Sequence, residues 1–123
     1  KILTLTTDAF EFDDARTASQ VEPLEQVIDI LVERLRAQHI KRLKDGACSI
    51  DTGVVYLDVL NNVERISDHC SNIAARLVGM EAGEDYDSHT LKNMMHHNPT
   101  KEYMLNYEQC RKDYLIPLEQ LEA

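Results

Sequence analysis

Apolar residues recur along most of this 123-residue chain at intervals of three and four, the spacing of one face of an α-helix. Strict alternation of apolar and polar residues over the length of a strand is hard to find, and the chain has only 4 Gly and 3 Pro. The pattern predicts an all-α fold, an antiparallel helical bundle. We expect a single domain over residues 1–123, because a chain of this length can bury one sizeable core.

A long second helix is predicted from near Ser19 to Asp45. Ser19 and Glu22 match a capping box, and Gly46 is the residue type that ends a helix. The apolar residues of this helix form one stripe, made of Leu24, Val27, Ile28, Leu31 and Leu35.

A third helix is predicted from Ser49 or Asp51 to about Gly83. Its large apolar residues alternate three and four apart, which predicts a heptad-like seam against other helices, made of Tyr56, Val59, Val63, Ile66, Cys70, Ile73 and Leu77. The short link between the second and third helices makes them antiparallel neighbours, so residues 19–83 are expected to form the core helical hairpin.

The two ends of the chain are expected to add helices to this hairpin. Residues 1–18 are interpreted as the remainder of a longer first helix, helical over about Ile2–Asp14. Residues 84–123 are predicted to be a C-terminal helical extension. It would have an acidic turn around Glu84–Asp87, a helix over Ser88–His97, and a last helix from Lys101 that ends near Pro117.

Charge and composition narrow the classes of partner. A net charge of -9 argues against binding to nucleic acid or to an anionic membrane surface. No apolar run is long enough to span a bilayer, so we expect no direct membrane insertion of this segment. The 3 cysteines have no paired spacing and fit a reducing compartment, which predicts a cytoplasmic location.

Carboxylate pairs one helical turn apart are the candidate chemistry. The chain has four pairs at the spacing i, i+4, namely Glu25/Asp29, Asp29/Glu33, Glu64/Asp68 and Glu81/Asp85. Random placement of 22 acids predicts roughly four such pairs, so the spacing alone carries no signal. The position of one pair on its helix is informative. Glu64 and Asp68 interrupt a helix row of small or apolar residues, made up of Gly53, Leu57, Leu60, Ser71 and Ala75.

Glu25 and Asp29 border the apolar stripe of the preceding helix in a similar way. If the two helices pack antiparallel, the two pairs can converge on one space and form a hard-oxygen site suited to Mg, Mn, Ca or Fe. Arg36 and Arg65 are the competing partners, because either could neutralise an acid in a plain salt bridge. His96 and His97 are a poor chelating pair, since neighbouring side chains point about 100° apart on a helix.

The residues Val63-Glu64-Arg65-Ile66-Ser67-Asp68, followed by Asn72-Ile73, resemble the signature helix of PhoU-type phosphate-regulatory domains. Ser67 stands where that motif has Gly. The upstream segment Val21–Asp29 is similar to the family's preceding helix and carries its acid-x-x-x-Asp motif at Glu25 and Asp29. The segments His39–Leu43 and Asp68–Ala74 are closest to the C-terminal cytoplasmic PhoU-like domain of bacterial sodium/phosphate cotransporters.

The resemblance implies a PhoU-like three-helix repeat, here with an additional C-terminal helix, and a non-catalytic regulatory role in phosphate transport or signalling. It implies that Glu25, Asp29, Glu64 and Asp68 bind a metal ion (Fe, Mn, Zn, Mg or Ca). The expected partners are a membrane transporter segment in cis or a phosphate-signalling protein. Full PhoU proteins carry two repeats, so a homodimer of this single repeat is expected.

Two other readings stay open from the sequence. One is a structural helical interaction or dimerisation module whose acidic pairs are solvated and bind no metal. The other is a metallohydrolase built on the four carboxylates, although the chain lacks a Gly-rich phosphate loop, a nucleophile elbow and a His-Glu-x-x-His motif. The absence of these motifs favours a protein that is not an enzyme.

Overall fold

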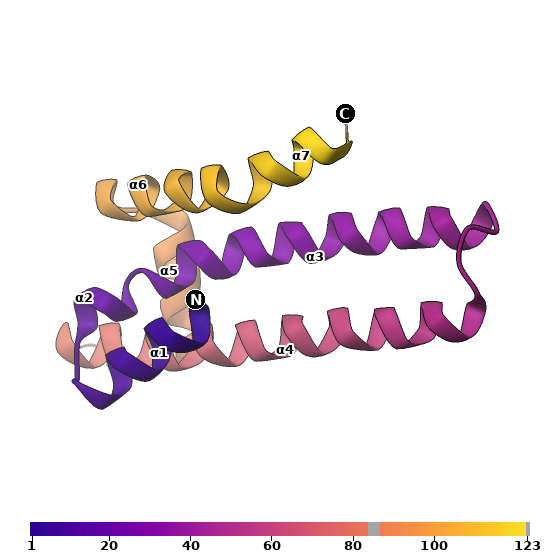
Figure 1. Ribbon diagram of the computed structural model, residues 1–123. Helices are drawn as coiled ribbons and strands as arrows, with labels where there is room; N and C mark the ends of the chain where they lie inside the picture. The colour runs from indigo at the N-terminus through magenta and orange to yellow at the C-terminus, as the bar shows by residue number, and fades with distance from the viewer. Residues whose placement is uncertain (84–86, 123) are drawn as a thin grey trace.

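Two long antiparallel helices dominate the structure, a computed structural model that describes residues 1–83 and 87–122. Helix α3 (Val21–Lys44) and helix α4 (Ile50–Glu81) lie side by side and make the most extensive contact between elements (Figure 1). The described residues contain helices and no strand, so the predicted all-α bundle is confirmed.

The N-terminal segment forms two short helices where one was expected. Helix α1 (Ile2–Glu11) and helix α2 (Ala15–Ala18) are separated by Asp13, whose φ of 51° lies in the left-handed region and ends the first helix. The Asp14 side chain then accepts hydrogen bonds from the first turn of α2 and caps it. Both short helices pack against α4.

The start of α3 differs from the predicted capping box. Ser19 lies at the C-terminal end of α2 and donates to the Arg16 carbonyl at 2.6 Å, and α3 begins at Val21 with no side-chain cap. Glu22 cannot serve as the return half of the box because its carboxylate is engaged with other helices. The predicted end is confirmed: Gly46 has a φ of 72°, and the Ala47 N–H donates to the Arg42 carbonyl at 2.9 Å.

The face of α4 that contacts its neighbours also differs from the prediction. Ser49 caps this helix as expected. The predicted seam, however, is largely exposed over the first half of α4, where Val59 and Val63 are 54% and 43% accessible. The buried residues are mostly small, namely Gly53, Leu60, Ser67, Cys70, Ser71, Ala74, Ala75 and Gly79. Small side chains let the helix backbones approach closely, which the spacing of large residues could not reveal.

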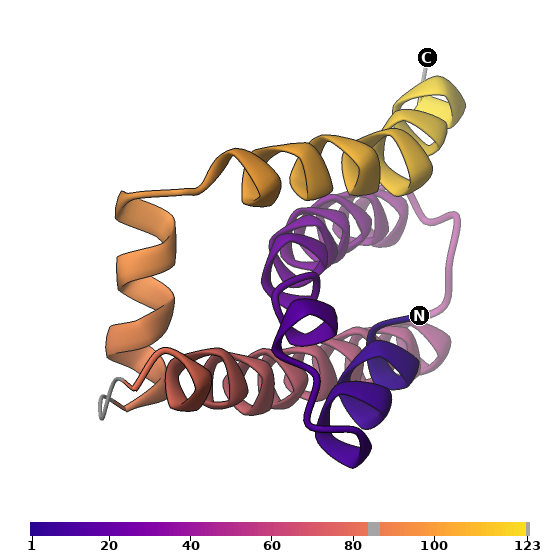
Figure 2. The same cartoon turned by 90° about the vertical axis from the view of Figure 1, so that its left-hand side faces the viewer.

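The C-terminal extension folds back over the hairpin. Helix α5 (Ser88–His97) crosses from the end of α4 to α6 (Lys101–Cys110), which lies along α3 (Figure 2). A π-helical turn, η1 (Arg111–Leu115), then leads into α7 (Ile116–Glu122).

The prediction that the last helix ends near Pro117 is wrong, because Pro117 lies in the first turn of α7, where its missing N–H is tolerated. Residues 84–86 of the expected acidic turn lie outside the described residues. The Glu81/Asp85 pair cannot be placed for the same reason, because Asp85 is one of them.

A buried histidine joins α3 to α4 near their connecting loop. His39 is 2% exposed, its Nε2 lies 3.2 Å from the Gly53 carbonyl oxygen, and its Nδ1 lies 3.0 Å from the Arg42 guanidinium. Since Arg42 can only donate, Nδ1 accepts and Nε2–H donates to the carbonyl. Gly53 favours this close approach, because a Cβ there would lie 2.7 Å from Leu43 Cδ2, which would have to move, and 3.1 Å from the buried His39 Nε2.

Replacing Gly53 with Val is expected to lower the free energy of unfolding by about 1–3 kcal/mol through overpacking against Leu43 and His39. Chemical denaturation followed by circular dichroism measures this change. The matched control is Val54→Ala at the next, exposed position, which should change stability by no more than about 0.5 kcal/mol. Equal stability of the two variants would contradict the close packing of α3 on α4 at Gly53.

Candidate functional site

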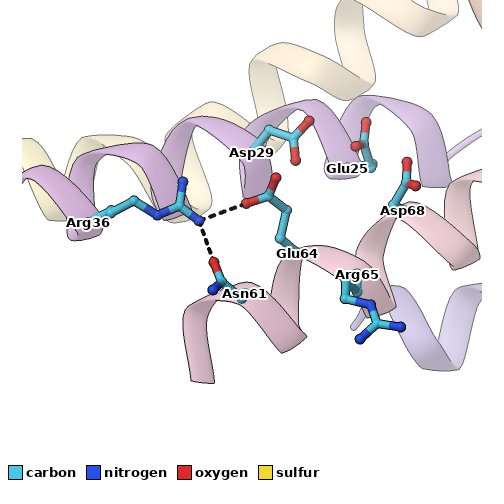
Figure 3. Close-up of a pocket in the computed structure, with 7 residues that line it drawn as sticks. All are labelled: Glu25, Asp29, Arg36, Asn61, Glu64, Arg65 and Asp68. Carbon is cyan, nitrogen blue, oxygen red and sulfur yellow. Dashed lines mark hydrogen bonds and ion pairs between the residues drawn. The ribbon is translucent and has the colours of Figure 1, made fainter. Parts of the chain in front are cut away.

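The two predicted carboxylate pairs line a single pocket between α3 and α4. The pocket has a volume of about 470 Å³ and is lined by Glu25, Asp29, Arg36, Asn61, Glu64, Arg65 and Asp68 (Figure 3). Each pair lies on one helix with a spacing of one turn, and the antiparallel hairpin turns the two pairs toward each other. The structure therefore brings all the predicted site residues together. Their role as metal ligands stays a prediction.

Arg36 of α3 occupies the side of the pocket nearest the connecting loop. Its guanidinium lies 3.1 Å from a Glu64 carboxylate oxygen and 3.0 Å from the Asn61 side-chain oxygen. Of the two arginines expected to compete for the acids, Arg36 therefore does so, while the Arg65 guanidinium points away from the pocket (Figure 3).

Lys92 enters from α5 at the other end of the pocket. Its Nζ lies 3.3 Å from Asp68 Oδ1 and 3.5 Å from Asn72 Oδ1, and its side chain is only 15% exposed. Lys92 could not be predicted from the sequence, because no local spacing encodes the orientation of α5 relative to the hairpin. The one available signal is that Lys92 is the only Lys or Arg in the Ser88–His97 helix.

Glu25 is the most buried of the four pocket carboxylates, whereas Asp29, one turn further along α3, is exposed. Burial, together with a hydrogen bond with Asp29 and the charge of Glu22, raises the pKa of Glu25 to about 9. Burial also raises the pKa of Asp29, opposed by its hydrogen bond to Glu25. Glu25 therefore holds a proton at neutral pH and donates it toward Asp29.

The pocket carboxylates are chemically suited to a hard metal cation, because carboxylate oxygens are the ligands that Mg, Ca, Mn and Fe prefer. It does not form a closed coordination sphere: in the described part of the chain, no three His, Cys, Asp or Glu side chains are grouped closely enough to hold a metal ion. Arg36 and Lys92 instead neutralise one acid each. Metal binding would require both cationic side chains to release their carboxylates.

A second polar cluster lies beside this pocket and was missed in the sequence. The Glu22 carboxylate is 2% exposed, accepts a hydrogen bond from the Ser71 hydroxyl, and lies 2.7 Å from His96 Nε2. The ring of Tyr103 meets His96 edge-on at 6.5 Å between centroids. These contacts join α3, α4, α5 and α6. Burial raises the pKa of the Tyr103 hydroxyl above its ordinary range, with the charges of Glu22 and Glu25 adding to the effect.

Comparison with known families agrees with this geometry. The PhoU domain matches residues 1–77, from α1 through most of α4, and this segment includes all the pocket carboxylates. The chain therefore belongs to the PhoU domain family. Helices α5 to α7, including Lys92 and His96, lie outside the matched segment.

The curated relatives are accessory proteins of phosphate-specific transport systems. PhoU homolog 1 of Thermotoga maritima is 26% identical over 77 residues, which cover 63% of this chain and 33% of that protein. The PhoU homolog of Streptococcus pneumoniae serotype 4 is 34% identical over 79 residues, covering 64% of this chain and 37% of that protein. The chain thus spans about a third of the length of these relatives.

No solved structure matches the chain. Among the described helices, none combines the length and the apolar character needed to cross a membrane.

Replacing Glu25 with Gln is expected to remove a pH dependence of stability. Because the folded-state pKa of about 9 lies above the ordinary 4.5, the folded protein binds this proton more tightly than the unfolded chain. The free energy of unfolding therefore falls as pH rises between these two values. The variant should lose this part of the slope and exceed the parent by about 1–2 kcal/mol near the upper end of the window.

Urea denaturation across this pH range measures the slope. Glu33→Gln is the matched control, because it removes one carboxylate from an exposed position of the same helix. Parallel curves for the parent and the Glu25 variant would refute the buried, protonated state of this residue.

Proposed function

We propose that this chain is a non-catalytic regulatory domain in phosphate transport or signalling, and that its carboxylate pocket binds a divalent or trivalent metal ion. The observation that carries the proposal is the convergence of Glu25, Asp29, Glu64 and Asp68 on one pocket within the PhoU-matched segment. The relatives named as phosphate-transport accessory proteins support the regulatory role.

The proposed ligands are the carboxylates of Glu25, Asp29, Glu64 and Asp68, and the metal ion would be Fe, Mn, Zn, Mg or Ca. A bound cation would offset their charges and tie α3 to α4. Binding competes with two groups of the chain itself, Arg36 on Glu64 and Lys92 on Asp68. It also requires loss of the Glu25 proton, so the apparent affinity rises with pH.

The proposed partner is a membrane transporter segment in cis or a phosphate-signalling protein, at the cytoplasmic face of the membrane. The motifs at His39–Leu43 and Asp68–Ala74 support the cotransporter branch of the family. A homodimer is part of the same proposal, as the resemblance to PhoU proteins with two repeats implies.

A structural interaction module without metal is the second candidate. It is favoured by the ion pairs at 3.1 Å and 3.3 Å, through which Arg36 and Lys92 already offset part of the pocket's negative charge. Under this alternative, combined Glu64→Ala and Asp68→Ala substitution removes the partners of Arg36 and Lys92 and lowers the free energy of unfolding by no more than about 1–2 kcal/mol, and no metal co-purifies.

Replacing Lys92 with Met is expected to strengthen Mn²⁺ binding on the order of tenfold, because it removes the cation that competes for Asp68 while keeping most of the side-chain volume. Asp68→Asn is expected to abolish binding. Isothermal titration with Mn²⁺ at constant pH measures both changes, and the shift of the thermal midpoint with Mn²⁺ checks them independently.

Lys112→Met is the matched control, since Lys112 is exposed on η1 and is not one of the pocket-lining residues. It should leave the Mn²⁺ affinity unchanged. Protein that contains no metal by elemental analysis, and whose thermal midpoint moves neither with chelator nor with any of the five candidate ions, would refute the metal proposal.

A further inference from the structure

Helix α5 has little apolar contact with the hairpin it crosses (Figure 2). Among the described residues of this helix only Leu91 is buried. It packs against Gly79 of α4, where a Cβ would lie 2.7 Å from Leu91 Cδ1. One buried leucine is a small apolar contact for a helix of 10 residues. The attachment of α5 therefore depends on the polar contacts that its side chains make.

Two such contacts lie one turn apart on α5 and reach different helices. Lys92 pairs with Asp68 of α4 at 3.3 Å, and His96 Nε2 lies 2.7 Å from Glu22 Oε1 of α3. Residues four apart share one face of a helix, so the same face of α5 is held by both long helices of the hairpin.

The contact between His96 and Glu22 joins a buried acid to an accessible base. Glu22 is 2% exposed, so its carboxylate depends on Ser71 and His96 in place of water. The His96 side chain is 34% exposed and can exchange its proton with solvent. Histidine is the side chain whose charge ordinarily changes between about pH 5 and pH 8.

We propose that His96 and Glu22 form a pH-sensitive latch that holds α5 on the hairpin most firmly when His96 is protonated. The imidazolium Nε2–H donates a charge-assisted hydrogen bond to Glu22. The neutral ring keeps the hydrogen bond but leaves the buried charge of Glu22 without a counter-charge. The docking of α5 therefore weakens, without being lost, as pH rises through the neutral range.

The other groups that face this contact keep their charge state over most of the range. Glu25, on the same helix as Glu22, holds its proton because its pKa is about 9. Burial raises the pKa of the Tyr103 hydroxyl of α6 above its ordinary range, so this group stays neutral. Ser71 of α4 carries no charge. Among the described groups around Glu22, His96 is therefore the one whose charge changes.

The latch acts on the carboxylate pocket through the second contact of α5. When α5 opens, Lys92 leaves Asp68, so the pocket loses one of its cationic side chains. Acid conditions favour the closed arrangement and alkaline conditions the open one. The inference concerns the docking of α5 and holds whether or not the pocket binds metal.

Hydrogen exchange measured by mass spectrometry on the 123-residue chain, with chelator present, tests the latch. Rates at about pH 5.5 and about pH 8 are corrected for the intrinsic pH dependence of amide exchange. We expect the protection of residues 88–97 in the parent to fall on the order of tenfold toward the higher pH. His96→Gln should remove this change, because the amide donates a hydrogen bond to Glu22 but does not titrate.

His97→Gln is the matched control. His97 is the neighbouring exposed residue, and its Nδ1 lies 3.0 Å from the Asn93 carbonyl oxygen within α5. This variant should keep the change, which separates the latch from the general stabilisation that a charged histidine gives to the end of a helix. In a Glu22→Gln background, His96→Gln should have no further effect on the pH dependence, because the charge that His96 offsets is gone.

Circular dichroism should show the same helix content in all the variants. The pH dependence that burial of Glu25 gives to the whole fold remains in the parent and in His96→Gln, so their difference isolates the latch. An equal change of protection in the parent and in His96→Gln would overturn the proposal. Loss of the change in His97→Gln, or a full effect of His96→Gln in the Glu22→Gln background, would do so too.

Discussion

The close approach of α3 and α4 is the constraint on which the site depends. It is made possible by small residues on the inner face of α4, among them Gly53, Ser71 and Ala75, and it is held near the connecting loop by the buried His39. The same approach brings the carboxylates of the two helices to one pocket. Negative charges gathered at a partly dry interface need compensation, and the hairpin and helix α5 both contribute to it.

That compensation comes from three different sources. Arg36 belongs to the hairpin itself and pairs with Glu64, whereas Lys92 comes from α5 and pairs with Asp68. Glu25 is neutralised by holding its proton, because its burial makes ionisation costly. The neighbouring Glu22 is satisfied by Ser71 and His96. One proton and two cationic side chains therefore offset most of the pocket's negative charge, and all three can be exchanged.

Much of the fold followed from local patterns in the sequence. The hairpin, the Ser49 cap, the Gly46 stop and the Ser88–His97 helix are each specified by residues within a few positions of one another. The convergence of Glu25 and Asp29 with Glu64 and Asp68 also followed, since each pair lies on one face of a helix of the antiparallel hairpin.

Features that depend on contacts between residues far apart in the chain could not be predicted from the sequence. The seam of large residues on α4 looked like the main contact, but contact with α3 is made by small side chains that carry a weak hydrophobic signal. The apparent capping box at Ser19 failed because Glu22 has stronger partners on α4 and α5. Lys92 and His96 reach the site through the orientation of α5, which no local spacing encodes.

The position of Lys92 also makes the pocket and the C-terminal extension parts of one equilibrium. Lys92 lies outside the family-matched segment, yet its ammonium group forms an ion pair with Asp68, one of the four carboxylates within that segment. A ligand that displaces Lys92 from Asp68 therefore breaks an ion pair that holds α5 against the hairpin, and part of its binding free energy is spent on this loss. By thermodynamic reciprocity, anything that draws α5 away from the hairpin strengthens that ligand's binding by the same factor. For any such ligand, the docking of α5 and the occupancy of the pocket are thereby coupled, although the extension contributes none of the four carboxylates.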